Sequence, residues 1–156
     1  MQKISTCLWF ENQAEEAAEF YVSVFDDARI LEVSRYGDGG PGPAGGVMTA
    51  EFEIEGRRFL ALNGGAPSNF TEAVSFVVDC EGQGEVDRYW AALTDGGAES
   101  QCGWLRDRFG VSWQIVPSVL GSLIGGPDPE GAQRAMQAML GMRKLDIAGL
   151  QTAYEG

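Results

Sequence analysis

The chain has 156 residues, with 11 Lys and Arg against 23 Asp and Glu, no histidine and three cysteines. Its length predicts a single domain over residues 1–156, and its hydrophobic content of 44% is typical of a globular protein. A net charge of −12 predicts neither a nucleic-acid partner nor binding to an anionic membrane surface, because like charges repel. The lack of histidine excludes a Ser-His-Asp triad, a Cys-His pair and a histidine metal ligand.

The cysteines and the apolar segments indicate the compartment. Cys7, Cys80 and Cys102 are odd in number and have no C-x-x-C spacing, so we expect neither a disulfide framework nor a structural zinc site. Scattered thiols suit a reducing cytoplasm. The first residues show no signal peptide, and no apolar run approaches 18 residues. We therefore expect a cytoplasmic protein with no membrane partner.

The first half of the chain predicts a strand, a helix and three more strands. The expected helix starts near Ala14 with Asn12 as its N-cap, and Gly56 turns the last two strands into a hairpin. A glycine-rich loop over 37–46 precedes that hairpin. The expected strands are 4–10, 29–36, 47–55 and 57–63.

After a linker at 64–69, the same order returns. A strand at 72–80 is followed by a helix that ends before Gly96, and then by three short strands. Helical segments follow, the middle one with Asp128 as N-cap and Pro129 in its first turn. The expected strands are 98–101, 104–109 and 112–116, and the expected last helices are 118–124, 129–142 and 146–154.

This order is an internal repeat. We predict an α+β fold with a tandem βαβββ repeat at 3–63 and 72–117, followed by a C-terminal helical extension at 118–156. Thr6 precedes the aromatic pair Phe20-Tyr21 by the spacing at which Ser75 precedes Tyr89-Trp90, so the pattern aligns Thr6 with Ser75.

Several motifs carry a resemblance to a known superfamily. They are Leu8-Trp9-Phe10 with Ala14-Glu15-Glu16-Ala17, Leu62-Asn63-Gly64-Gly65, Cys102-Gly103-Trp104-Leu105, and the run Gly110–Pro117. With this repeat, the chain resembles the vicinal oxygen chelate superfamily of glyoxalase I, bleomycin-resistance proteins and extradiol dioxygenases. It looks most like the PhnB-like branch, known as the 3-demethylubiquinone-9 3-methyltransferase domain. The resemblance implies a curved mixed sheet whose paired units close a cup around a small-molecule ligand, and a homodimer.

The resemblance also implies where a metal would bind. Metal-dependent members take ligands from the first strand, the strand that opens the second repeat and the last strand, which map to Thr6, Ser75 and Gln114. Two hydroxyls and an amide are poor ligands for Zn²⁺ or Fe²⁺. We therefore expect a degenerate metal site and no cofactor, while Mg²⁺ bound through substrate oxygens stays open.

The same three residues are candidates for ligand binding. Ser75 and Gln114 alternate out of phase with the apolar Phe76 and Trp113, so we expect them to face the cup with Thr6 and the indole of Trp104. If the protein is an enzyme, Gln114 would be catalytic by polarising a substrate oxygen. The plain alternative is that these polar residues are simply solvated.

Other features point to no further chemistry. Cys102 lacks a base that would make it a nucleophile, and packing is its expected role. The 37–46 loop precedes a strand and so lacks the helix that a phosphate site needs; it is either a connector or a lid. No glycine-rich turn for a methyl donor is visible. Met136, Met139 and Met142 have the spacing of core or dimer contacts.

The sequence therefore favours a PhnB-like, small-molecule-binding protein that either only binds or acts on a small oxygenated metabolite. One alternative is a non-catalytic, ligand-sequestering dimer of the resistance type. A second alternative is a protein-interaction module, which predicts an exposed apolar patch. The C-terminal helices either cap the cup or form the dimer interface.

Overall fold

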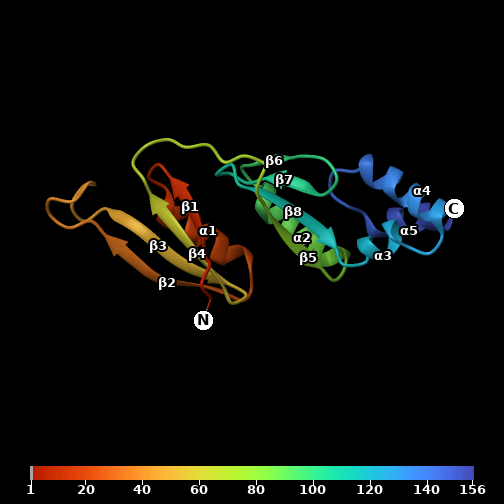
Figure 1. Cartoon of the computed structure of the whole chain (residues 1–156), viewed down its shortest axis with the longest axis horizontal. Helices are drawn as coiled ribbons and strands as arrows, with labels where there is room; N and C mark the ends of the chain where they lie inside the picture. Colours follow the sequence, from red (N-terminus) through yellow and green to blue (C-terminus); the bar gives the residue numbers. More distant parts are fainter. Residues whose placement is uncertain (1) are drawn as a thin grey trace. The chain divides into compact units, whose positions relative to one another are not determined.

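A computed structural model describes residues 2–156 and divides the chain into two compact units, Met1–Asn69 and Phe70–Gly156. The boundary lies at the end of the predicted linker at 64–69. Figure 1 shows the elements of each unit. The two units are described separately, and the prediction that they form one domain stays a prediction.

The first unit contains one helix and a four-stranded sheet, as the sequence predicted. Strand order is β1-β4-β3-β2, with β1 parallel to β4 and the other neighbours antiparallel. The elements are β1 (Thr6–Phe10), α1 (Ala14–Val24), β2 (Ala28–Arg35), β3 (Val47–Ile54) and β4 (Arg57–Asn63).

The second unit repeats this topology and adds three helices. Its strand order is β5-β8-β7-β6, again with one parallel pair, β5 with β8. The α+β fold with a tandem βαβββ repeat and C-terminal helices is thereby confirmed. The elements are β5 (Ser75–Cys80), α2 (Gln83–Thr94), β6 (Ala98–Glu99), β7 (Trp104–Arg106), β8 (Ser112–Pro117), α3 (Leu120–Ile124), α4 (Pro129–Leu140) and α5 (Ile147–Glu155).

Each sheet buries one face under its own helix. In the first unit, alanines of α1 let the helix approach the sheet, and the Phe52 ring stacks on Tyr21 and Phe59 at centroid distances of 5.8 and 5.1 Å. In the second unit, α2 buries Trp90 and Leu93. Burying each large apolar side chain contributes roughly 1.5–3 kcal/mol. The alternate residues of each strand point to the opposite face of the sheet, away from the helix.

A buried carboxylate fixes the start of β8. Asp107, only 3% exposed, accepts hydrogen bonds from the backbone N–H of Phe109 and Val111 at 2.9 and 3.0 Å. It also accepts one from the indole N–H of Trp113 at 2.9 Å. The turn at Gly110 and the helix-facing side of β8 are therefore held by one side chain.

The first helix is capped differently from the sequence prediction. Gln13, not Asn12, is the N-cap, and no side chain of that segment caps the helix. Instead, the Ala14 N–H donates to Asn63 Oδ1 at 2.8 Å, while Asn63 Nδ2 donates to the Val47 carbonyl at 3.1 Å. The Tyr36 hydroxyl donates to the Asn63 carbonyl at 2.9 Å. A residue distant in sequence has taken the capping role, which local pattern cannot reveal.

The glycine-rich loop at 37–46 closes on Tyr36. The Tyr36 N–H donates to the Gly46 carbonyl and the Gly45 N–H to the Tyr36 carbonyl, both at 2.8 Å. Gly42 lies against the Tyr36 ring so closely that a Cβ there would clash with it. These bonds at the base of the loop favour the connector over the lid.

The C-terminal helices have a small core of their own. Asp128 caps α4, as predicted, by accepting from the Glu130 N–H at 3.2 Å. Met139 and Met142 pack against this core, which agrees with the core interpretation of the methionine spacing. Its buried residues are Leu120, Leu123, Ala135, Leu145 and Leu150. Within residues 2–156, none of the helices has the length and hydrophobicity needed to cross a bilayer.

Asn63→Ala should destabilise the protein by about 2 kcal/mol, because it removes a helix cap and a second side-chain hydrogen bond. Urea unfolding followed by far-ultraviolet circular dichroism measures the change. The control is Asn12→Ala, which removes the exposed residue that sequence favoured as N-cap and should change stability by less than about 0.5 kcal/mol. Equal effects from the two variants would contradict the assignment.

Candidate functional site

The face of the second sheet opposite α2 carries three of the four predicted ligand-binding residues. On β8 the neighbours of Gln114, Trp113 and Ile115, are buried on the helix side, so Gln114 points to the other face. Gln114 Nε2 donates to Ser75 Oγ of β5 at 3.0 Å. Trp104 of β7 is the direct cross-strand partner of Gln114. The structure thus brings Ser75, Gln114 and Trp104 together on three adjacent strands.

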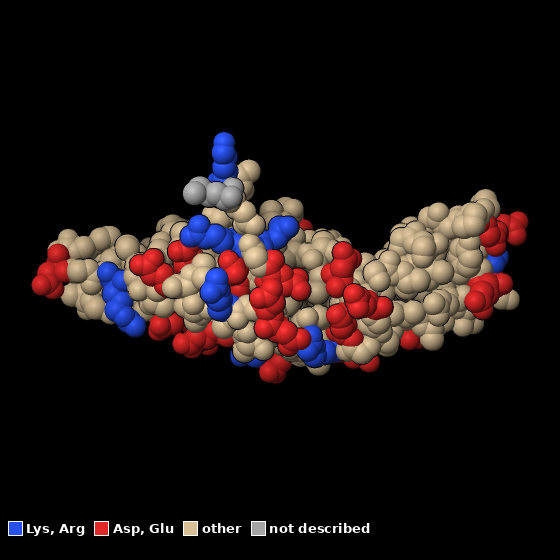
Figure 2. All heavy atoms as spheres, turned by 90° about the horizontal axis from the view of Figure 1, so that it is seen from below, with Lys and Arg blue, Asp and Glu red and all other residues tan. Residues whose placement is uncertain are grey.

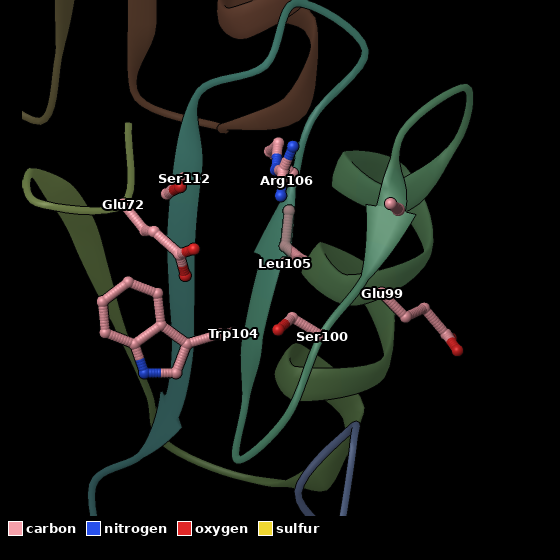
Figure 3. A pocket seen from close by; sticks show the side chains of 8 residues that line it. Glu72, Glu99, Ser100, Trp104, Leu105, Arg106 and Ser112 are labelled. Carbon is pink, nitrogen blue, oxygen red and sulfur yellow. The ribbon is translucent and has the colours of Figure 1, made fainter. Parts of the chain in front are cut away.

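A small cavity lies beside Trp104. Its volume is about 90 Å³, far below the roughly 300–1,000 Å³ of most ligand pockets, so it can enclose only part of a metabolite. Figure 3 shows the side chains of Glu72 and Trp104 near Ser112 of β8, with Arg106 on β7, the strand that also carries Trp104. The lining residues are Glu72, Ala98, Glu99, Ser100, Trp104, Leu105, Arg106 and Ser112.

The polar groups of this face keep unused hydrogen-bonding capacity. Within residues 2–156, Gln114 Oε1, the Trp104 indole N–H and the Arg106 guanidinium have no hydrogen-bond or ion-pair partner from the protein. The bond to Ser75 fixes the amide of Gln114, so its carbonyl oxygen has a set direction. Of the three predicted residues on this face, Trp104 lines the cavity, whereas Ser75 and Gln114 lie outside its lining.

Thr6 does not share this arrangement. It pairs with Phe59 and lies on the same side of β1 as the buried Leu8 and Phe10. In the second unit the corresponding pair is Phe76 with Trp113, so Thr6 matches Phe76 and not Ser75. The alignment of Thr6 with Ser75 was therefore wrong by one residue. The reason is that three residues connect β1 to α1 while two connect β5 to α2.

The donor set of this face does not fit a transition metal. Ser75 Oγ and the Gln114 amide are neutral and bonded to each other, and Thr6 belongs to the helix-covered side of its own sheet. Within the described residues 2–156, no three His, Cys, Asp or Glu side chains group in a way that could hold a metal ion.

Seven of the eight lining residues were not among the predicted site residues, and three of them show which signals the sequence holds. Arg106 and Ser112 lie two positions from Trp104 and Gln114, so the two-residue period of a strand places them on the same face. That signal was available. Glu72 precedes β5 and has no periodic neighbour, so only the tertiary structure brings it to the cavity.

Glu51 and Asp79 are carboxylates that could act as general bases only if they faced the site, and the two are placed differently. Glu51 of the first unit forms an ion pair with Arg58 across neighbouring strands. Asp79 alternates in phase with Ser75 on β5 and is exposed.

Acidic side chains are scattered over the face in Figure 2, with Lys and Arg side chains between them. Exposed ion pairs of this kind contribute little to stability.

Two of the thiols are poor nucleophiles. Burial, with the nearby carboxylates of Glu85 and Asp79, raises the pKa of Cys80 to about 12. Desolvation also raises the pKa of Cys7. A thiol that stays protonated attacks slowly. Cys102 occupies a tight turn with φ of 59°, beside Trp104.

Comparison with known proteins gives one family and several related structures. The model of a family described as 3-demethylubiquinone-9 3-methyltransferase matches residues 2–116. The structure of the PhnB protein from Bacillus cereus is 40% identical with a TM-score of 0.69, and the match covers 75% of this chain and 100% of that chain. A search of curated proteins gave no match.

Two more distant structures show likeness of fold alone. Protein PA1353 from Pseudomonas aeruginosa is 22% identical with a TM-score of 0.62, over 75% of this chain and 98% of that chain. The fosfomycin resistance protein FosX from Listeria monocytogenes is 12% identical with a TM-score of 0.51, over 76% and 93%.

Alkaline pH should destabilise the protein through Cys80. Its pKa is 9.0 in an ordinary environment and about 12 when folded, so the folded state keeps a proton that the unfolded state releases. The stabilisation is full below pH 9.0 and is lost as pH rises toward 12. Between pH 8 and pH 10, wild type should lose on the order of 1 kcal/mol more than Cys80→Ala in urea unfolding. Parallel losses in both proteins would contradict this.

Proposed function

Because the chain belongs to the 3-demethylubiquinone-9 3-methyltransferase family, with residues 2–116 matching its model, we propose that it binds a small oxygenated molecule at Ser75, Gln114 and Trp104. The fold is that of the vicinal oxygen chelate superfamily, which includes PhnB proteins and FosX. One fold hosts many chemistries, so the proposal rests on the residues of the site.

The observation that carries the proposal is the Gln114–Ser75 hydrogen bond of 3.0 Å beside an indole. It leaves one carbonyl oxygen and one N–H of the amide, and the Ser75 hydroxyl proton, for a ligand. The Trp104 ring offers a flat surface for an apolar or aromatic portion. A molecule with a ring and neighbouring oxygens can stack on the Trp104 indole and form hydrogen bonds with Gln114 and Ser75 at the same time.

The polar groups favour binding over catalysis. An amide polarises an oxygen by hydrogen bonding, but it does not exchange protons near neutral pH, so Gln114 acting alone cannot be a general base. The family description names a methyl transfer; here the strand-to-helix connection at 11–13 has no glycine, and the two-residue connection at 81–82 has one, Gly82, which is the N-cap of α2. We therefore propose a ligand-binding role, and a catalytic role for Gln114 stays a prediction.

We propose that this binding needs no transition metal, because the donors of the site are neutral and bonded to each other. We also assign the function to the cytoplasm, where the free thiols of Cys7, Cys80 and Cys102 would stay reduced.

The protein as purified should retain a small molecule and no stoichiometric transition metal. Native mass spectrometry of the full chain, beside an elemental metal assay, measures both. Catechol and salicylate then serve as oxygenated aromatic probes in ligand-observed NMR, with toluene as the probe without oxygens. We expect binding of the oxygenated probes to persist after EDTA treatment. One transition metal per chain, or binding abolished by EDTA, would overturn the metal-free assignment.

Trp104→Ala should weaken probe binding at least about tenfold, since it removes the stacking surface. Gln114→Leu should weaken it by about two- to tenfold, the range of one hydrogen bond to a neutral group. The matched control is Gln137→Leu, which changes an exposed glutamine of α4 in the same way. Probes that bind all four proteins equally would place the ligand elsewhere.

We further propose that a second copy of the chain is a partner. Within the described residues 2–156, β5 is an edge strand that pairs with β8 alone; it carries the exposed Val77, and Val74 before it is 70% exposed. Unpaired strand edges with exposed apolar side chains invite pairing with another chain. Sedimentation velocity should show a dimer that Val74→Asp weakens and Val74→Thr retains. A monomer at all concentrations would contradict it.

A further inference from the structure

The C-terminal extension, residues 118–156, lies outside the shared fold. The family model ends at residue 116, and the whole PhnB structure from Bacillus cereus matches within 75% of this chain. The extension nevertheless forms a folded body with its own buried core. Its contacts with the second unit therefore show what this chain adds to the common architecture.

Those contacts include the turn that leads into Trp104. The N–H of Cys102 donates to the Met142 carbonyl, and the N–H of Gly103 donates to the Arg143 carbonyl, both at 2.8 Å. Leu145 packs on the same turn, because a Cβ at Gly103 would lie 3.1 Å from Leu145 Cδ1. We name residues 142–145 the strap.

The turn needs outside support. The Trp104 N–H donates to the Gln101 carbonyl at 3.0 Å, and both central residues have positive φ, 59° at Cys102 and 84° at Gly103. This is the backbone sign pattern of a type I′ turn, which strongly prefers Asn-Gly, Asp-Gly or Gly-Gly. Cysteine is strained in the left-handed region. The strap accepts one hydrogen bond from the strained Cys102 and a second from Gly103, and the two together hold the turn in place.

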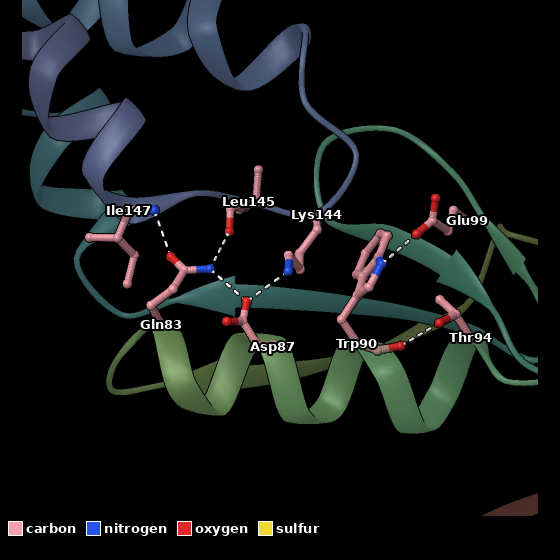
Figure 4. A network of polar contacts seen from close by, with 8 residues as sticks. All are labelled: Gln83, Asp87, Trp90, Thr94, Glu99, Lys144, Leu145 and Ile147. Carbon is pink, nitrogen blue, oxygen red and sulfur yellow. Dashed lines mark hydrogen bonds and ion pairs between the residues drawn. The ribbon is translucent and has the colours of Figure 1, made fainter.

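The strap is itself anchored at a distance from the turn, as Figure 4 shows. Gln83, at the start of α2, donates from Nε2 to the Leu145 carbonyl at 3.1 Å and accepts the Ile147 N–H on Oε1 at 2.8 Å. Lys144 Nζ lies 2.9 Å from Asp87 Oδ1. The hydrogen bond from Gln83 and the Lys144 charge lower the pKa of Asp87. Gln83 thus fixes the strap without touching the candidate site.

We propose that the strap positions Trp104 for the ligand by holding the Cys102–Gly103 turn, with Gln83 as the positioning residue that anchors it. This inference rests on the proposed function, in that Trp104 lines the proposed binding face. The extension thereby supports the Trp104 side of the site, through the backbone hydrogen bonds between the turn and the strap.

The test incorporates 5-fluorotryptophan into the full chain and follows its four tryptophans by ¹⁹F NMR. Trp104→Phe identifies the Trp104 resonance. Gln83→Ala should shift that resonance by more than its line width and leave that of Trp9, in the first unit, unchanged. Amide exchange over the strap and Ile147 should rise roughly tenfold or more, because Gln83→Ala removes the hydrogen bonds to the Leu145 carbonyl and from the Ile147 N–H. Gln137→Ala, on α4, should change neither signal.

Rescue separates positioning from general damage. Cys102→Asn creates the preferred Asn-Gly turn, so in the Gln83→Ala background it should restore the Trp104 resonance while strap exchange stays fast. In the Gln83→Ala variant, catechol binding should weaken and recover in the same pattern. A Trp104 resonance that is unmoved when the strap is released would overturn the positioning role. Catechol that fails to bind wild type, with the resonance still moving, would instead refute the proposed function alone.

Discussion

The geometry of this protein depends on a single constraint: each four-stranded sheet has one helix to cover it, so only one face of each strand can be buried in its unit's core. The strand period of two then assigns every residue to one side. On β8 this places Trp113 and Ile115 under α2 and turns Gln114 to the opposite face. The candidate site is therefore a direct consequence of how the core is covered, and a one-residue change in register would exchange core and site.

That constraint also explains why the two repeats differ in chemistry while sharing a fold. In the first unit the residue that pairs with Phe59 is Thr6, and the core side of β1 continues with Leu8 and Phe10. In the second unit Phe76 takes the place of Thr6, and Ser75 comes one residue before it. The Ser75 hydroxyl accepts a hydrogen bond from Gln114. The connection between the strand and the helix is one residue shorter in the second unit. Two residues at the same distance before their helices therefore lie on opposite faces of the two sheets.

The polar groups of the site are held in two ways. Gln114 is directed by the hydrogen bond that it donates to Ser75 of the same sheet, whereas Trp104 follows a strained turn whose N–H groups donate to the carbonyls of the strap. Buried Asp107 secures the other end of β7 and β8 through the loop between them. The face opposite α2 thus gains a defined shape from hydrogen bonds of its own strands and of the adjoining turns, which is the kind of support that an orienting site requires.

The sequence by itself determined the fold class, the repeat, the linker and most elements, because apolar periodicity and glycine placement act over a few residues. It also determined that histidine chemistry is absent, and alternation selected Ser75 and Gln114 for one face, to which the Cys102-Gly103-Trp104 motif added Trp104 and the helix spacing wrongly added Thr6. Only the tertiary structure decided that Asn63 caps α1, that Thr6 faces the core, that Glu72 reaches the cavity and that residues 142–145 support the Cys102 turn. The first, third and last are contacts between residues far apart in the chain, and the second depends on a one-residue difference in loop length, so no local pattern encodes them.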